Sequence, residues 1–211
     1  MTSSGFTDYG QTYMCPGPGC LKDNFRAYKS GKTTLKNTGI SEKVQTFKNF
    51  KMMPGVKATY QAFKALADGE AAFRLLLAYG GVGNGKTHLC NALARELHAA
   101  GIPTQYYAAP DMFSMLRQGI NNHTVDNQVE KLKNIDALII DDFKVENFTM
   151  NWEAPKLEEI IDARYREIRL TVLVVNQDLD KIPERVMSRF FEPDIGKVVL
   201  NDAVDYRTLR K

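Results

Sequence analysis

The sequence is poor in the features that mark secreted and membrane proteins. It has only 3 cysteines in 211 residues, which gives no disulfide framework and suits a reducing compartment. No apolar run approaches the roughly 20 residues that cross a bilayer. The N-terminus, MTSSGFTDYG, lacks the basic start and apolar core of a signal peptide. We therefore expect a cytoplasmic globular protein with no membrane partner.

Metal-binding side chains are also sparse and scattered. Cys15 and Cys20 share the stretch CPGPGC, but the three histidines all lie far along the chain. Two thiolates are half of a four-ligand zinc site. The sequence thus argues against a closed structural zinc within this chain, and it leaves open whether the pair is the remnant of one.

No charge sign dominates the whole chain, yet one segment is strongly basic. The net charge is +3, whereas the segment from Lys22 to Lys51 carries eight basic and two acidic residues, hence +6, and the rest sums to −3. A basic arm on a slightly acidic body suggests an anionic partner, most often nucleic acid. A solvated leader is the alternative interpretation.

The chain divides near residue 46. Residues 1–45 show no sustained hydrophobic period and predict a basic N-terminal extension, either a tail or a truncated partner-binding module. Residues 46–211 alternate apolar runs with helical patterns, which predicts an α/β fold with a doubly wound, mainly parallel five-stranded sheet. The expected strands are 73–79, 104–108, 137–141, 172–175 and 197–200, and the expected helices are 56–67, 85–100, 110–118, 124–133, 153–168 and 183–190.

The strongest motif follows the first of these strands. It satisfies the P-loop pattern G-x-x-x-x-G-K-[ST], in which glycines let backbone N–H groups approach phosphate oxygens. The helix that begins there adds its positive end to the same anion. Lys86 is expected to contact the β- and γ-phosphates of ATP or ADP, and the Thr87 hydroxyl to bind Mg²⁺. The motif reads Gly80-Gly81-Val82-Gly83-Asn84-Gly85-Lys86-Thr87.

Acidic residues end the third predicted strand, in LIIDD. A carboxylate buried beside apolar residues is costly unless a cation accompanies it. Asp141 is therefore the expected second Mg²⁺ ligand. Asp142 is expected to orient and deprotonate the attacking water, with a helix cap or loop acid as the alternative. An aspartate reaches less far than a glutamate, so slow turnover fits this sequence.

Two further side chains are catalytic candidates. Asn176 directly follows a buried strand, where an amide can hydrogen-bond the γ-phosphate or the water, and Gln177 is the reserve. Arg189 lies near the end of a predicted helix and can project into a neighbouring subunit as an arginine finger. A helix C-terminus also favours an arginine for electrostatic reasons alone.

Taken together, these motifs resemble those of AAA+ ATPases of the DnaC/DnaI helicase-loader group, with IstB-type transposition helpers as close relatives. The resemblance rests on GGVGNGKTHL, LIIDDF, VVNQ, ERVMSRF and DYRTLRK, and on TFKNF at the start of the ATPase domain. It covers residues 46–211. The chain ends about twenty residues after Phe190, so only a minimal lid is expected, as is typical of this group.

The resemblance implies roles for particular residues. Lys86 and Thr87 match the Walker A lysine and magnesium ligand, and Asp141 and Asp142 match the Walker B pair. Asn176 matches sensor 1, Arg189 the finger that acts in trans, and Arg207 the sensor 2 arginine. The expected nucleotide-binding set is Gly81, Gly83, Asn84, Gly85, Lys86, Thr87, His88 and Arg207.

The resemblance also implies partners. Members of the group self-assemble as spiral oligomers, bind single-stranded DNA and load a DnaB-type hexameric replicative helicase. Residues 1–45 are shorter than the group's helicase-grasping module, which makes helicase binding the least supported of these expectations. Phe113, Arg117, Lys131 and Lys133 are possible DNA contacts, although core packing and solvation explain them equally well.

Three functions therefore remain open. The leading hypothesis is an ATP-dependent helicase loader or remodeller in DNA replication. The second is an IstB-type transposition helper, whose partner is a transposase. The third is an interaction scaffold locked by a nucleotide, with little hydrolysis.

Overall fold

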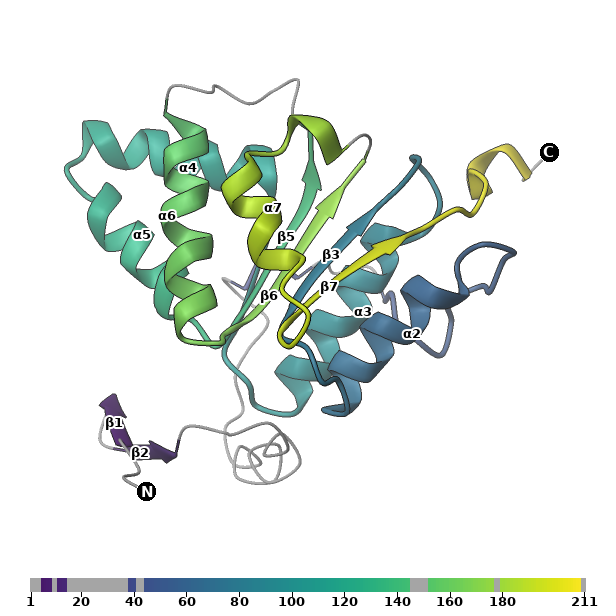
Figure 1. The fold of residues 1–211 in the computed structure, drawn as a ribbon, viewed down its shortest axis with the longest axis horizontal. Helices are drawn as coiled ribbons and strands as arrows, with labels where there is room; N and C mark the ends of the chain where they lie inside the picture. Colours follow the sequence, from purple (N-terminus) through teal and green to yellow (C-terminus); the bar gives the residue numbers. More distant parts are fainter. Residues whose placement is uncertain are drawn as a thin grey trace.

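A five-stranded parallel sheet organises the described part of the chain (Figure 1). The computed structural model describes residues 5–8, 11–14, 38–40, 44–144, 152–176 and 179–209. The sheet order is β4-β5-β6-β3-β7, and every neighbouring pair is parallel, which confirms the expected fold class. The strands are β3 (Leu75–Tyr79), β4 (Thr104–Ala108), β5 (Ala137–Phe143), β6 (Leu170–Val175) and β7 (Gly196–Leu200).

Helices cover both faces of this sheet (Figure 1). Helices α2 (Lys57–Asp68) and α3 (Lys86–Ala99) pack on one face. Four helices pack on the other face, namely α4 (Ala109–Asn121), α5 (Val125–Asn134), α6 (Glu153–Arg166) and α7 (Glu184–Phe190). Short 3-10 turns, η2 (Leu179–Lys181) and η3 (Tyr206–Leu209), complete the order.

Strand β3 shows why its sequence is apolar throughout. Leu76 and Ala78 belong to the core beneath α2 and α3, whereas Leu75 and Leu77 belong to the core beneath α4 to α7. All four are fully buried. A strand with helices on both faces has no polar side, and this explains an apolar run without alternation. Within the described ranges, every helix is too short or too polar to cross a membrane.

The N-terminal extension contains a pair of strands that its sequence does not predict. Strands β1 (Gly5–Asp8) and β2 (Gln11–Met14) form an antiparallel pair. Cys15, Cys20 and most of the basic segment lie outside the described residues. Thr38 contacts the sheet, because its carbonyl accepts a 2.8 Å hydrogen bond from the N–H of Tyr106 in the edge strand β4. The domain boundary at residue 46 stays a prediction.

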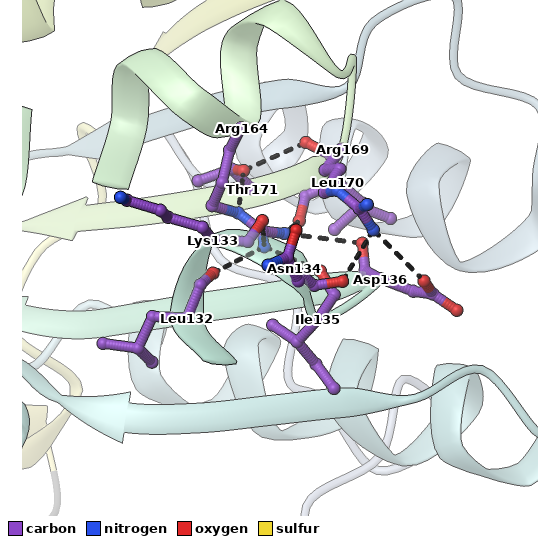
Figure 2. Close-up of polar contacts among 9 residues, drawn as sticks. All are labelled: Leu132, Lys133, Asn134, Ile135, Asp136, Arg164, Arg169, Leu170 and Thr171. Atoms are coloured by element: carbon purple, nitrogen blue, oxygen red, sulfur yellow. Dashed lines mark hydrogen bonds and ion pairs between the residues drawn. The ribbon is translucent and has the colours of Figure 1, made fainter. Parts of the chain in front are cut away.

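Arg164 joins the elements at the amino ends of β5 and β6 (Figure 2). Its side chain is fully buried on α6. Its guanidinium donates to the Thr171 hydroxyl at 2.8 Å and to the carbonyls of Leu132 at 2.8 Å, Ile135 at 2.7 Å and Leu170 at 2.6 Å. These carbonyls belong to the end of α5, the loop before β5 and the first residue of β6. One guanidinium group therefore donates hydrogen bonds to several buried carbonyl groups at the ends of helices and strands, where backbone partners are lacking.

Candidate active site

The P-loop runs from the carboxyl end of β3 to the first turn of α3, and its shape requires glycine. Gly80 has φ +136° and Gly85 has φ +94°, both in the region that side chains rarely adopt. A Cβ on Gly80 would lie 2.2 Å from the carbonyl oxygen of Asn201. Gly85 is the N-cap of α3 and has no side-chain cap bond. The loop thus ends at a helix N-terminus of the kind that binds anions.

Lys86 is buried within this loop, with 3% of its surface exposed. Its Nζ donates to the carbonyls of Gly80 at 2.9 Å and Gly81 at 2.5 Å, and to Oδ1 of Asn84 at 3.0 Å. Burial lowers the pKa of Lys86 to about 8, and the negative charge of Asp141 opposes that shift. The predicted lysine therefore lies at the P-loop, within the electrostatic reach of the predicted acidic residue.

Asp141 is the buried acid at this end of β5, with 2% of its surface exposed. Burial raises its pKa, and hydrogen bonds from the hydroxyls of Tyr106 and Thr87 and from the backbone of Asp142 act in the opposite direction. Thr87 and Asp141 are therefore in direct contact. A hydroxyl and a carboxylate are hard oxygen donors of the type that Mg²⁺ prefers, so this pair fits the expected metal.

Asp142 is displaced from the regular strand geometry. It has φ +53°, and the β5–β6 pairing shifts register between Ile140 and Phe143. Bulges of this kind re-aim a side chain, and they are frequent next to active sites. Here the Asp142 carboxylate accepts a short hydrogen bond from the amide of Asn176, which follows β6. The structure thus brings together two candidates 34 residues apart in sequence. Gln177 lies outside the described residues.

His88 has contacts that the motif alone does not indicate. Its Nε2 lies 2.9 Å from the carbonyl of Thr46 and 3.1 Å from Oδ1 of Asn49, so it donates to both. Its ring meets that of Phe50 edge to face at 5.1 Å. His88 therefore holds the TFKNF segment against the first turn of α3, and its contact with nucleotide stays a prediction.

The loop after β7 also packs on the P-loop. Asn84 and Asn201 exchange side-chain-to-carbonyl hydrogen bonds of 3.0 and 3.1 Å, and Asn201 is buried. The N–H of Tyr206 donates to the carbonyl of Gly83 at 3.0 Å. The next residue, Arg207, is exposed. Asn201 was not predicted from the sequence, because β7 is only partly buried and its apolar run is a weaker signal than the fully buried β6 that precedes Asn176.

Arg189 is held by side chains of its own chain. Its Nε donates to Oδ1 of Asp162 at 2.9 Å, and Arg185 contacts the other carboxylate oxygen at 2.7 Å. The Arg189 guanidinium also lies over the ring of Tyr165, at 4.5 Å from the ring centre. The Arg189 side chain is 31% exposed. The helix α7 thus presents two arginines that are anchored to the same carboxylate of α6.

The possible DNA contacts differ in their surroundings. Phe113 is 4% exposed and packs in the core beneath α4 to α7, as the core interpretation expects. Arg117 forms an ion pair with Glu153, and Lys133 forms ion pairs with Glu130 and Glu159. Binding of DNA by these residues stays a prediction.

Sequence comparison identifies the group to which this architecture belongs. Residues 41–193 match the model of the bacterial DnaA ATPase domain. The chromosomal replication initiator DnaA of Aquifex aeolicus is 25% identical over 172 residues, which are 79% of this chain and 42% of that protein. The DnaA of Lactobacillus helveticus is 30% identical over 175 residues, or 81% and 38% of the two proteins. The chain thus spans about two fifths of the length of these curated relatives.

Solved structures agree on the fold. A DnaA replication initiator bound to AMPPCP and single-stranded DNA superposes with a TM-score of 0.68 at 25% identity, covering 79% of this chain and 52% of that one. The DnaC helicase loader superposes with a TM-score of 0.65 at 17% identity, covering 74% and 96%. At that identity the likeness to DnaC shows the fold alone. The expected AAA+ membership is confirmed, whereas the narrower DnaC/DnaI grouping stays a prediction.

The matched family model covers the P-loop, both acids of β5, Asn176 and Arg189. The chain therefore belongs to the family of the bacterial DnaA ATPase domain, within the AAA+ ATPases of replication initiation.

Proposed function

We propose that this chain is an ATP-dependent loader or remodeller in DNA replication that binds Mg-ATP and hydrolyses it. The proposal rests on one observation: Lys86, Thr87 and Asp141 lie close together at the carboxyl ends of the strands. Thr87 contacts Asp141, and the charge of Asp141 acts on Lys86. A glycine loop, an ammonium group and a metal-ligating pair are the parts that phosphoryl transfer requires.

Each side chain has a distinct part in this proposal. Lys86 exchanges its loop acceptors for the β- and γ-phosphates, and Thr87 and Asp141 hold Mg²⁺. The metal, when bound, offsets the charge on the phosphates. Asp142 and Asn176 are already hydrogen-bonded to one another. That pair orients the attacking water, with the Asp142 carboxylate taking its proton.

Nucleotide binding is tested by Lys86→Ala. Removing the buried ammonium should weaken binding of a fluorescent ATP analogue by about 100-fold or more, because charge-assisted phosphate contacts are strong. The exposed Lys57 on α2 provides a matched control, and Lys57→Ala should bind like the unaltered chain. Equal binding by the Lys86 variant and the unaltered chain would refute the assignment of this loop.

The same proposal assigns Arg189 as the finger that completes a neighbouring subunit's site. Arg189→Ala should bind ATP normally and lose the turnover that rises with protein concentration, by a factor on the order of 10³. Arg185→Ala is the control, since both arginines contact Asp162 but only Arg189 is assigned to the finger. If both variants hydrolyse ATP at the same concentration-stimulated rate, Arg189 has no such role.

Single-stranded DNA, a DnaB-type helicase and other copies of the chain are the proposed partners. Support comes from a DnaA relative bound to single-stranded DNA and from the scaffold shared with the DnaC loader. Co-purification with the replicative helicase in ATP and in ADP tests this assignment. Capture of a transposase instead would favour the transposition helper. Absence of phosphate release with single-stranded DNA present would favour the scaffold that is locked by nucleotide.

A further inference from the structure

Tyr106 is a polar side chain of the candidate site that belongs to neither of its motifs. It lies on β4, next to β5, and its hydroxyl donates to Oδ2 of Asp141 at 2.7 Å. In the pairing of the two strands, Ala108 is the residue opposite Asp141. Tyr106 is two positions earlier and therefore points to the same face of the sheet. The phenol reaches the acid along the strand direction.

The other oxygen of Asp141 already has a donor. The N–H of Asp142 bonds Oδ1 at 2.8 Å, so the tyrosine and this N–H hold opposite oxygens of one carboxylate. Asp141 is 2% exposed, and bulk water has little access to take the place of either donor. Asn91 hydrogen-bonds the phenol of Tyr106 and also donates to the carbonyl of Thr87 at 2.9 Å. The tyrosine is thereby linked directly to the Asp141 carboxylate and, through Asn91, to the backbone of Thr87.

We propose that Tyr106 is a positioning residue that orients the Asp141 carboxylate toward Mg²⁺. This inference rests on the proposed function, because it concerns the same metal site. A carboxylate with both oxygens fixed cannot rotate away from the position in which it meets the cation. Outer-shell hydrogen bonds of this type typically change metal affinity by about 10- to 100-fold when they are removed.

The neighbouring residue offers a matched control. Tyr107 is on the same strand and faces the opposite way, and its hydroxyl hydrogen-bonds the sulfur of Met115 at 3.5 Å and the side chain of Gln105, neither of which is a proposed metal ligand. The backbone at Tyr106 is fixed on both sides, by β5 and by the bond to Thr38. Tyr106→Phe therefore deletes one hydroxyl and keeps the ring and the strand in place.

The experiment measures the Mg²⁺ concentration that half-saturates binding of a fluorescent ATP analogue. Tyr106→Phe should raise this concentration by at least about 10-fold. Tyr107→Phe should leave it unchanged. The affinity for the analogue in EDTA should be equal in all three proteins, because the hydroxyl acts through the metal ligand rather than on the phosphates. Melting temperatures without nucleotide monitor folding.

The outcomes test the role of Tyr106 separately from the proposed function. An unchanged Mg²⁺ midpoint in Tyr106→Phe, with normal nucleotide binding, overturns the role of Tyr106 and leaves the proposed function standing. A parallel loss of melting temperature and of affinity in EDTA overturns it too, because that pattern indicates a purely structural tyrosine. If the unaltered chain shows no saturable binding of Mg-ATP, the proposed function fails and this inference fails with it.

Discussion

Lys86 and Arg164 are both buried cations, and they lie at opposite ends of the parallel strands. Lys86 follows the carboxyl end of β3, whereas Arg164 contacts residues at the amino ends of β5 and β6. Burial lowers the pKa of both, to about 8 for Lys86 and to about 9 for Arg164. In both cases the hydrogen bonds described above go to carbonyl, amide or hydroxyl oxygens rather than to a carboxylate.

The two cations differ in what holds their acceptors. The Lys86 acceptors belong to a glycine loop, in which Gly81 is exposed, and an incoming phosphate oxygen can replace them. The acceptors of Arg164 are carbonyls fixed by α5, by the start of β5 and by β6. A ligand could replace them only if these elements separated. Burial of a cation is therefore compatible with ligand binding or with a structural role, and the location of its acceptors, in an anion-binding loop or between packed elements, distinguishes the two.

The largest effect is expected at the architectural cation. Arg164→Met removes a guanidinium from several buried acceptors, and each buried acceptor left without a partner costs about 1–3 kcal/mol. The free energy of unfolding should fall by about 4 kcal/mol, as measured by denaturant titration. Arg166→Met, at an exposed site on the same helix, should change it by less than about 0.5 kcal/mol. A small effect of Arg164→Met would show that these carbonyls find water or other donors.

A much smaller stability effect is expected at the binding cation. Lys86→Ala should change the free energy of unfolding by less than about 1 kcal/mol in either direction, because the lost hydrogen bonds are offset by relief of a buried charge. The measurement is the same denaturant titration used for Arg164. A loss as large as that expected for Arg164→Met would remove the distinction between the two sites.

The smallest effect is expected where charges meet at the surface. Glu159 contacts Lys133 at 2.6 Å and Lys156 at 2.9 Å, and these partners lower its pKa. Its side chain is 39% exposed, so solvent screens the pair. Glu159→Gln should reduce the free energy of unfolding by about 0.5 kcal/mol at neutral pH.

The pH dependence of this difference has a definite sign. A carboxyl group with a lowered pKa in the folded state stabilises the protein above its unfolded pKa, and that contribution disappears as the pH falls through the folded value. The gap between Glu159→Gln and the unaltered chain should therefore close between about pH 5 and pH 3. A gap that persists in acid or in high salt would mean that Glu159 acts by packing instead of charge.

Local pattern was enough to predict the elements of this fold. The apolar run before the P-loop and the helical spacing after it locate β3 and α3 to within a few residues. The parallel sheet followed from the alternation of the two types of element. The hairpin of β1 and β2 was not predicted, because GFTD and QTYM are too short and too polar to show a period.

The candidate site could be predicted only in part from the same information. Lys86 was identifiable from the P-loop motif that follows β3, and Asp141 from its place at the end of a predicted apolar strand. The contact between Asp142 and Asn176 depends on the bulge in β5, and that of Tyr106 with Asp141 depends on β4 lying beside β5. Neither the bulge nor the strand order can be predicted from a local sequence pattern.

The sequence by itself determined which residues form strands, helices and the phosphate loop, because backbone preference and hydrophobic period act over a few neighbouring residues. Only the tertiary structure decided which buried polar groups meet. Arg164 and Arg166 look alike in the sequence, yet one is enclosed and the other is in solvent. A buried polar group needs hydrogen-bond partners, because it has lost its contacts with water. The order of the strands, rather than the neighbouring sequence, brings those partners within reach.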